Sequence, residues 1–277
     1  ADDYSAPYRL LLAFYRNRPL RMSADAPRHR LAKWIAQSGY CSRRAAERLI
    51  SAGQVHCNGR AALHTDLVNH NDDILINNLP LPAQPPRQYW LYHKPVGIDC
   101  NNRPDDPASL YQLLKTLPER VFSVGRLDKD SCGLLLLTND GELSQQLMHP
   151  DFYHEKTYLV ETDKAISEAF ITAMASGVSW QLGNKQYQSR PCQVSRNSQH
   201  QFTITLTQGL HRQIRYMCKT LGYRVLALKR IRLHNLCLGQ LTVGELRQLT
   251  SAELTQLQAL SALPQPETQT QCQAVHQ

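Results

Sequence analysis

Long hydrophobic runs are missing from this sequence of 277 residues. The best candidate, Leu10 to Phe14, lies between Arg9 and Arg16 and falls far short of the roughly 20 apolar residues that a membrane helix needs. It also lacks a small-residue cleavage site, so we expect neither a membrane span nor a secretory signal. The hydrophobic content of 42% is still enough to fill a core, which excludes disorder along the whole chain.

Paired cysteine motifs are also absent, since no two of the eight cysteines have Cys-x-x-Cys spacing. The sequence therefore predicts neither a zinc site nor a disulfide framework. Reduced thiols and a cytoplasmic location are the expectation. A glycine-rich nucleotide loop and other metal-ligand spacings are missing too, so we expect no cofactor and no metal.

Acidic residues are scarce in two stretches of an otherwise mildly acidic chain. The formal net charge is +8, and residues 28–60 and 209–232 each contain seven Lys or Arg with at most one acidic residue. One such stretch is often only a solvated face. Two of them in segments with regular periodicity favour a nucleic-acid footprint, because clustered cations neutralise backbone phosphates.

The hydrophobic pattern after residue 28 predicts a small ααβ unit. Leu31 and Ile35 share a helical face that Gly39 is placed to end. Ser42 is positioned to cap a second helix. Asn58-Gly59 between two short apolar runs, 55–57 and 60–63, predicts a hairpin turn, and another strand is expected at 73–76.

Proline content marks the expected domain boundary. Four prolines between residues 80 and 86 predict a stiff, extended spacer. We expect a flexible extension at 1–28, a small folded unit at 29–79, a linker at 80–87, a larger domain at 88–263 and a disordered tail at 264–277. In the larger domain, strands are expected at 89–93, 134–138, 157–161, 201–207 and 225–228. Helices are expected at 108–116, 143–148, 166–176 and 211–221, with a last one opened by Thr250. This order favours an α+β fold.

Cations of the first unit gather on its two helices and hairpin. The segment 30–59, with Ser-Arg-Arg before the second helix and Asn-Gly in the hairpin, resembles the S4 RNA-binding domain over almost its full length. Lysines and arginines in such a unit suit phosphate contacts, which supply affinity with little sequence reading. The candidate RNA-binding residues are Arg30, Lys33, Arg43, Arg44, Arg48 and Arg60.

The second domain presents a loop, Gly125-Arg-Leu-Asp128, that runs into a fully apolar strand. By itself, an Arg-Leu-Asp sequence is more often a salt-bridged loop carboxylate than a catalytic group. The longer run, with Ser131-x-Gly-Leu-Leu-Leu-Leu-Thr-Asn-Asp-Gly after it, resembles the catalytic motif of RNA pseudouridine synthases that carry an N-terminal S4 domain.

Three further motifs resemble the same family in the same order. They are His93-Lys-Pro-Val-Gly, His154-Glu-Lys-Thr-Tyr and Gly209-Leu-His-Arg-Gln-Ile-Arg, so the resemblance extends over about residues 29–260. Within the RsuA, RluB, RluE and RluF branch, Asp-Lys-Asp after Arg-Leu and the His-Glu-Lys stretch most resemble the RluF group. The resemblance implies a mixed, mainly antiparallel central sheet in the catalytic domain.

The resemblance also implies how uridine is isomerised. Asp128 is the essential aspartate beside C1′, Arg215 its ionic partner, and Tyr158 stacks on the flipped uracil. Whether the aspartate forms a covalent adduct or acts through a glycal stays open. Further candidate substrate-binding residues are Arg126, Leu127, Lys156, Arg212 and Ile214, with Leu127 and Ile214 as alternatives for an apolar floor.

Two departures from the family pattern concern which RNA is accepted. Asp99-Cys100 stands in place of an expected Ser-Thr pair, and Tyr216 in place of an expected arginine. The predicted partner is RNA, with 23S ribosomal RNA favoured and a tRNA anticodon or 16S ribosomal RNA as alternatives. A non-catalytic S4 ribosome-assembly factor and a hydrolase using Asp128 with Asp130 are alternatives of other classes. We expect a monomer.

Overall fold

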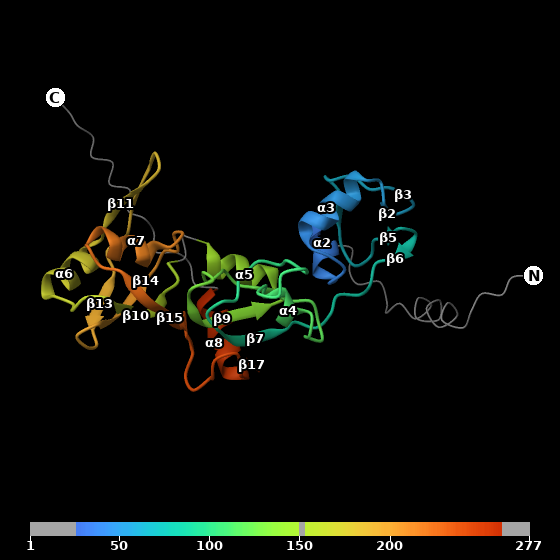
Figure 1. Cartoon of the computed structure of the whole chain (residues 1–277). Helices are drawn as coiled ribbons and strands as arrows, with labels where there is room; N and C mark the ends of the chain where they lie inside the picture. Colours follow the sequence, from blue (N-terminus) through green and yellow to red (C-terminus); the bar gives the residue numbers. More distant parts are fainter. Residues whose placement is uncertain (1–25, 150–152, 262–277) are drawn as a thin grey trace, which may run out of the picture. The chain divides into compact units, whose positions relative to one another are not determined.

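The computed structural model describes residues 26–149 and 153–261. The chain divides into two compact units between Pro86 and Arg87 (Figure 1). Most of the expected N-terminal extension, and the whole of the expected tail, lie outside the described residues. Within those residues, no helix is long and apolar enough to cross a membrane.

The first unit packs two helices and a small sheet around one core. Its helices are α2 (Leu31–Gln37) and α3 (Arg43–Ser51). A four-stranded sheet has the order β3 (Arg60–Ala61), β2 (Val55–Cys57), β5 (Ile74–Ile76), β6 (Leu79–Pro80), and β1 (His29–Arg30) pairs separately with β4 (Leu67–Val68). The core is formed by apolar side chains of the helices and of β2 and β5. Their burial supplies the main drive for folding of this unit.

Local sequence signals fix the turns of the first unit. Gly39 has a φ of +80° directly after α2, a conformation that costs glycine little. The hydroxyl of Ser42 accepts a 3.2 Å hydrogen bond from the Ala45 amide and caps α3. Asn58 and Gly59 both have positive φ between β2 and β3. These predictions are confirmed.

Pro80 lies in a strand, although the sequence predicts the spacer to begin there. It pairs with Leu75 in β6, the last strand of the small sheet. An edge position explains the difference, because a proline without an N–H is tolerated where one side of the strand is unpaired.

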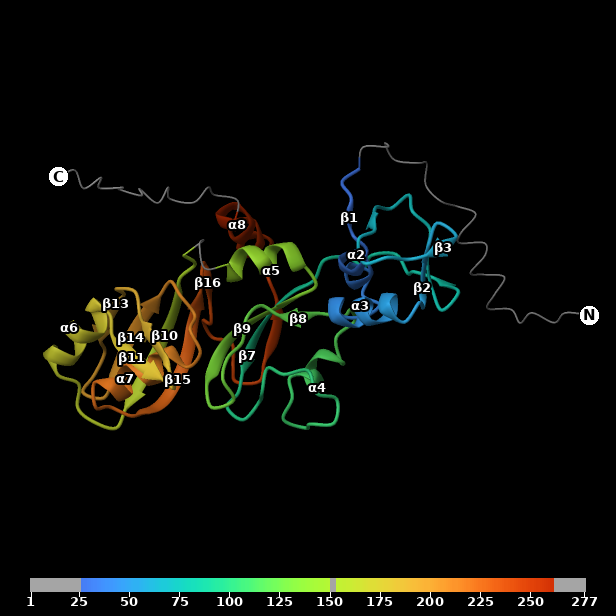
Figure 2. The same cartoon turned by 90° about the horizontal axis from the view of Figure 1, so that it is seen from above.

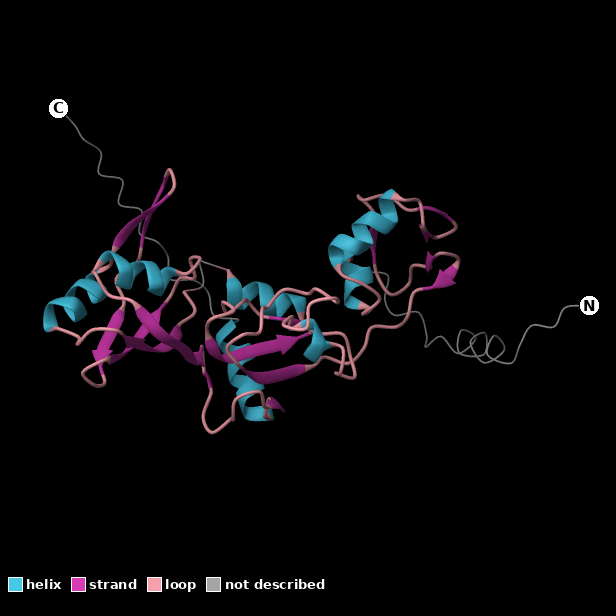
Figure 3. Ribbon diagram, viewed as in Figure 1, coloured by secondary structure: helices cyan, strands magenta, loops and turns pink. Residues whose placement is uncertain are grey.

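The second unit is built on a mixed sheet (Figure 3). Its strands follow the order β13 (Gln193–Arg196), β14 (Gln201–Leu206), β10 (Lys156–Thr162), β15 (Val225–Leu233), β9 (Cys132–Thr138), β7 (Tyr89–Lys94), β17 (Leu246–Gln248). β16 (Leu236–Cys237) pairs with β15, and β8 (Phe122–Ser123) with β9. The β15 to β9 pairing is parallel and the other pairings are antiparallel. The predicted mainly antiparallel sheet is confirmed.

The sheet is buried on both faces around β9. Leu134 and Leu136 pack in one cluster with α5 (Gly141–Met148) and α8 (Ser251–Ser261). Leu135 and Leu137 face the other way, into a cluster with α4 (Tyr111–Leu114). Alternate side chains of a strand point to opposite faces, so a strand covered on both sides must be apolar throughout.

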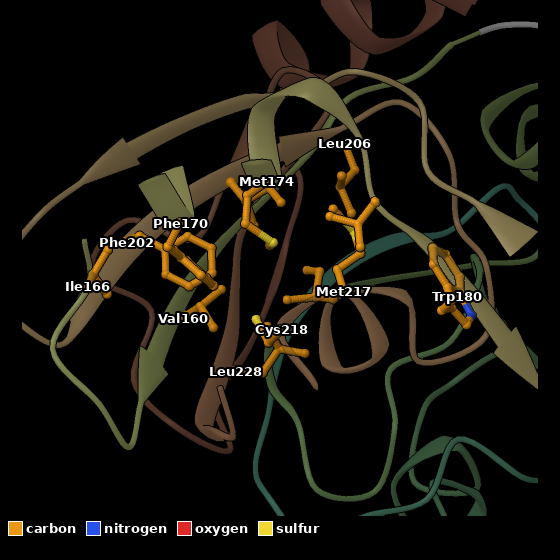
Figure 4. Packing of buried hydrophobic residues seen from close by; sticks show 13 residues of the cluster. Val160, Ile166, Phe170, Met174, Trp180, Phe202, Leu206, Met217, Cys218 and Leu228 are labelled. Atoms are coloured by element: carbon orange, nitrogen blue, oxygen red, sulfur yellow. The ribbon is translucent and has the colours of Figure 1, made fainter. Parts of the chain in front are cut away.

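A separate core lies under α6 (Glu168–Ser176) and α7 (Gln213–Thr220), which cover the β14, β10 and β15 part of the sheet (Figures 1 and 2). Phe170, Met174, Phe202 and Met217 gather in this cluster (Figure 4). The cluster fixes α7 against the sheet. It thereby positions the cationic start of that helix.

Several short elements were not predicted from the sequence. They are β8, β13, β16, β17 and the hairpin of β11 (Ser179–Leu182) and β12 (Lys185–Gln188). The helix expected at 108–116 is only the four residues of α4. These segments are short and largely polar, so pairing with neighbouring strands, rather than a periodic pattern, decides their conformation.

Candidate active site

A cleft of about 500 Å³ opens in the second unit beside the loop 125–131. Its lining comes from that loop, the loop 99–101, β10, β15 and the start of α7. Asp128 lines the cleft with its side chain 25% exposed. The loop continues directly into buried β9, which anchors the carboxylate on a rigid strand.

The motif His93-Lys-Pro-Val-Gly contacts this loop at Lys129. Lys94 is fully buried, and its ammonium donates hydrogen bonds to the carbonyls of Pro95 and Ile98, at 2.8 and 2.6 Å. Burial lowers the pKa of Lys94. The turn so formed directs the Gly97 amide onto the Lys129 carbonyl, at 2.7 Å. The two motifs, distant in sequence, are thus joined one residue after Asp128.

Cys100, one of the departures from the family pattern, supports the same loop from the other side. Its buried sulfur accepts a hydrogen bond from the Leu127 amide at 3.4 Å, and burial raises the pKa of the thiol. The neighbouring Asp99 accepts hydrogen bonds from the amide and side chain of Asn101. Asp99 and Cys100 therefore shape the wall of the cleft.

Two arginines at the start of α7 reach the loop. Arg212 donates to both oxygens of Asp130, at 3.1 and 2.8 Å, and its Nη1 lies 3.7 Å from Asp128 Oδ2. The hydrogen bonds from Arg212 are the main cause of a lowered pKa at Asp130. Arg212 has a φ of +51°, an uncommon backbone conformation for arginine.

The pairing of Arg215 with Asp128 is not found in the described residues. Nη2 of Arg215 instead lies 3.2 Å from Asp130 Oδ2 and donates to the Asp130 carbonyl at 2.9 Å. It also contacts the Ser131 hydroxyl at 3.3 Å. Arg215 lies one turn further along α7 than Arg212, which brings it to the end of the loop. In this structure Arg212, rather than the predicted Arg215, is the arginine within ion-pair distance of Asp128.

β10 carries two further predicted residues into the cleft. Lys156 and Tyr158 are two positions apart and therefore share one face of the strand. Lys156 is 8% exposed, and its ammonium donates to the His154 carbonyl at 3.2 Å. Burial, and then the charge of Arg230, lower the pKa of Lys156 to about 8. Tyr158 is half-buried and packs against apolar clusters on either side.

Apolar and cationic predicted residues complete the lining. Leu127 and Ile214 are buried, and both line the cleft together with Leu228. Arg126 is exposed beside them on the loop. A planar, partly apolar group could therefore enter between Tyr158 and the aliphatic side chains, in a cleft that cationic side chains also line.

Tyr216, the second departure from the pattern, does not line the cleft. Its ring stacks on Trp180 with centroids 6.3 Å apart, and Trp180 stacks on Tyr187 at 5.7 Å. These three rings attach the β11 to β12 hairpin to α7. No contact between Tyr216 and the described residues that line the cleft supports the expectation that position 216 alters substrate choice. The packing of Tyr216 against Trp180 explains the tyrosine instead.

The cationic residues predicted in the first unit have different surroundings. Arg30, Arg44 and Arg48 are exposed. Arg43 pairs with Glu47 at 3.5 Å on the same helix. Lys33 lies 3.5 Å from the His29 ring. Arg60 is bound to both oxygens of Asp66, at 3.0 and 2.7 Å, so its guanidinium is already engaged.

Two residues of the site were not given these roles by the sequence analysis. Asp130, considered there only as a second acid of a hydrolase, binds Arg212 and Arg215, and Arg230 is a buried arginine that lines the cleft. Alternation along β15 could have revealed Arg230, because it shares the inward face with apolar Leu228. Asp130 gives no such signal. Only the fold brings its partners, more than 80 residues later, to the loop.

Comparison with known proteins agrees with these features. The family model described as RNA pseudouridylate synthase matches residues 88–220, and the S4 domain model matches residues 29–74. The chain belongs to the RNA pseudouridine synthases, isomerases that convert uridine to pseudouridine in RNA, and it carries an N-terminal S4 domain. This confirms the predicted fold class and reaction.

Particular relatives narrow the placement within the family. The chain is 40% identical to the dual-specificity RNA pseudouridine synthase RluF of Escherichia coli (strain K12), over 82% of this chain and 78% of the relative. It is 35% identical to the ribosomal large subunit pseudouridine synthase B of Bacillus subtilis (strain 168), over 84% and 96%. A crystal structure of a pseudouridylate synthase superposes with a TM-score of 0.60 at 30% identity, covering 82% of this chain and 99% of that one.

Proposed function

We propose that this chain isomerises a uridine of large-subunit ribosomal RNA, with Asp128 at the reacting centre. The main observation in support is the position of this carboxylate at the cleft, 3.7 Å from Arg212. Its loop is held by hydrogen bonds from Gly97 to Lys129 and from Leu127 to Cys100. The named activities of the relatives of Escherichia coli and Bacillus subtilis support this substrate class. The S4 domain and the basic stretches support RNA as the partner.

The reaction begins with cleavage of the bond between N1 and C1′. The bonding pair leaves with uracil, whose ring becomes an anion, and the carboxylate acts on the ribose either by bonding to C1′ or by removing a proton and giving a glycal. After the ring turns, C5 bonds to C1′ while the carboxylate either leaves C1′ or returns the removed proton to C2′. C5 then loses its proton and N1 gains one. Atoms and electrons balance without a cofactor, so the protein must supply only positions and charges.

The cleft residues can be assigned to these tasks. Arg212, with Nη1 3.7 Å from Asp128 Oδ2, places a positive charge beside the carboxylate. Tyr158 stacks on the flipped base, against the apolar side chains of Leu127 and Ile214. Arg126, exposed on the loop, contacts the distorted RNA backbone or fills the vacated position of the base. Arg215, which holds the Asp130 carbonyl and Ser131, acts as a positioning residue rather than a catalytic one.

The first unit provides further affinity for RNA. Arg30, Lys33, Arg43, Arg44 and Arg48 are proposed to contact phosphates, with Arg44 and Arg48 as the main contacts because they are exposed and one turn apart on α3. We also propose a monomeric protein acting in the cytoplasm. Light scattering of the purified chain checks the oligomeric state.

The test is to incubate the protein and its Asp128→Asn variant with unmodified transcripts of 23S ribosomal RNA, 16S ribosomal RNA and tRNA. Pseudouridine is located by carbodiimide-dependent stops in reverse transcription. New stops in 23S ribosomal RNA with the wild type, and none with the variant, are expected. Stops only in 16S ribosomal RNA or tRNA would overturn the substrate class. Equal stops with both proteins would overturn the role of Asp128.

A further inference from the structure

Arg230 presents an unsatisfied donor inside the cleft. The residue is only 2% exposed, yet it lines the cleft together with Asp128 and Tyr158. Its Nε donates a 2.7 Å hydrogen bond to the Leu134 carbonyl, which fixes the guanidinium. Its Nη2 is buried and has no hydrogen-bond partner within residues 26–149 and 153–261. Buried donors without partners are rare, because a buried polar group that forms no hydrogen bond destabilises the folded protein.

A second buried cation lies near it. Lys156 also lines the cleft, and its ammonium donates a hydrogen bond to the His154 carbonyl. Among the described residues, neither Lys156 nor Arg230 forms an ion pair with a carboxylate. Two buried cations without an anion are unfavourable for the free protein. Such an arrangement indicates a negatively charged group that enters during the reaction.

The backbone places Arg230 beside the group proposed to stack on the base. Tyr158 and Arg230 are directly opposite each other on β10 and β15, so their side chains lie on the same face of the sheet. Gly133 of β9 pairs with Arg230 on its other side. An added Cβ at Gly133 would lie 2.6 Å from the Arg230 nitrogen, which shows how closely β9, and the Asp128 loop before it, approach this residue.

We propose that Arg230 donates a hydrogen bond from Nη2 to a carbonyl oxygen of the flipped uracil and, together with Lys156, stabilises the negative charge of the detached ring. This inference rests on the proposed function. When the N1 to C1′ bond breaks, the electron pair on N1 is delocalised over the ring and reaches both carbonyl oxygens. Donors already fixed at those oxygens stabilise the anion more than the neutral base, which is what lowers a barrier.

Burial distinguishes the base from a phosphate as the ligand. A backbone phosphate remains at the rim, where Arg126 is exposed and the Arg212 side chain is 35% exposed. Arg230, at 2% exposure, can be reached only by a group inserted deep into the cleft. The flipped base is the part of an RNA that meets this condition.

The first test measures single-turnover pseudouridine formation at increasing enzyme concentration, with nucleosides separated by liquid chromatography. Arg230→Met should lower the rate at saturation by roughly 100-fold, in the range found when a fixed donor to a developing anion is removed. The enzyme concentration at half-maximal rate should change by less than about threefold, since binding of the RNA depends mainly on phosphate contacts. Arg196→Met is the control: it removes an arginine of the same sheet that pairs with Glu168 on the surface.

The second test changes the acceptor instead of the donor, because Arg230→Met can also alter packing. Transcripts containing 2-thiouridine or 4-thiouridine replace one carbonyl oxygen by sulfur, a weaker acceptor. The wild type should be slowed by one of the two substitutions, and Arg230→Met and Arg230→Lys should show less than half of that discrimination. A protein in which Arg230 is merely structural would keep the full discrimination.

Three outcomes would overturn the inference while leaving the proposed function intact. They are an unchanged rate for Arg230→Met, a raised half-maximal concentration with a normal saturating rate, and unchanged thiouridine discrimination. The second of these would indicate a phosphate contact. Failure of the proposed function is distinguishable, because the wild type would then form no pseudouridine in 23S ribosomal RNA.

Discussion

Arg212 donates two hydrogen bonds to the carboxylate of Asp130, of 3.1 and 2.8 Å. The same guanidinium lies 3.7 Å from Asp128. The arginine is therefore shared, with Asp130 holding it in the orientation in which one Nη faces the proposed reacting carboxylate. Asp130 is not a second catalytic acid, as a hydrolase would require, but an anchor for the cation beside Asp128.

Removal of this anchor should slow the reaction without abolishing it. Asp130→Asn keeps the size of the side chain but loses the charge that orients Arg212, and we expect a roughly tenfold lower single-turnover rate from the loss of positioning. Asp130→Glu should recover part of the rate. A rate for Asp130→Asn equal to that of the wild type would show that Arg212 needs no anchor.

The lowered pKa of Asp130 means that this anchor is present at neutral pH and is lost only when pH falls below the usual pKa of an aspartate, near 3.9.

The activity should depend on the ionisation of Lys156. Its pKa of about 8 in the folded protein lies below the ordinary value of 10.5, because burial and Arg230 disfavour the cation. The cation is present below pH 8 and is lost above it, so kcat/KM should fall as pH rises through about 8. The free energy of unfolding should instead rise between pH 8 and pH 10.5. The buried cation destabilises the folded protein fully below pH 8, and this destabilisation disappears towards pH 10.5.

Lys156→Met provides the comparison for that pH profile. The variant should be slower below pH 8 and should lack the decline above it, while chemical denaturation should show a stability that no longer rises between pH 8 and 10. A decline near pH 8 that persists in the variant would assign the ionisation to another group.

Gly133 should tolerate no side chain. Its φ is +111°, and an added Cβ would lie 2.6 Å from the Arg230 backbone nitrogen and closer still to its carbonyl oxygen. Gly133→Ala should lower the free energy of unfolding by about 3 kcal/mol through backbone strain and forced separation of the strands. For a chain of this size, Tm should fall by roughly 6–12 °C. Gly141→Ala is the matched control, because an added Cβ there has no atom within 4 Å, and its Tm should not fall. An unchanged Tm for Gly133→Ala would contradict the close approach of β9 and β15.

The first unit offers a test of which arginines bind RNA. Replacing Arg44 and Arg48 by Met removes two exposed cations, and the slope of log affinity against log salt should decrease in magnitude by roughly 1.4–1.8. Arg60→Met should change this slope by less than about 0.5, because Arg60 is already bound to Asp66. Binding is measured by filter retention of 23S ribosomal RNA at several salt concentrations. Equal effects of Arg60 and of one helix arginine would show that the ion pair opens when RNA binds.

Most of the local elements and the residues of the motifs could be predicted from the amino-acid sequence. Helix ends at Gly39 and Ser42, the Asn58-Gly59 turn and the apolar strand after Asp128 all follow from short-range backbone preferences and periodicity. Asp128, Lys156 and Tyr158 could be named in advance because the motifs that contain them are continuous in the chain. Their presence in one cleft is what the structure adds.

Partners distant in sequence were decided only by the tertiary structure. The sequence predicted Arg215 as the partner of Asp128, but α7 approaches the loop so that Arg212 reaches it and Arg215 binds beyond it. Arg230 could be placed in the cleft only after β15 was paired between β10 and β9. Ion pairs and buried donors depend on distances of a few ångströms between separate elements. Those distances are set by how the cores pack, which no single segment encodes.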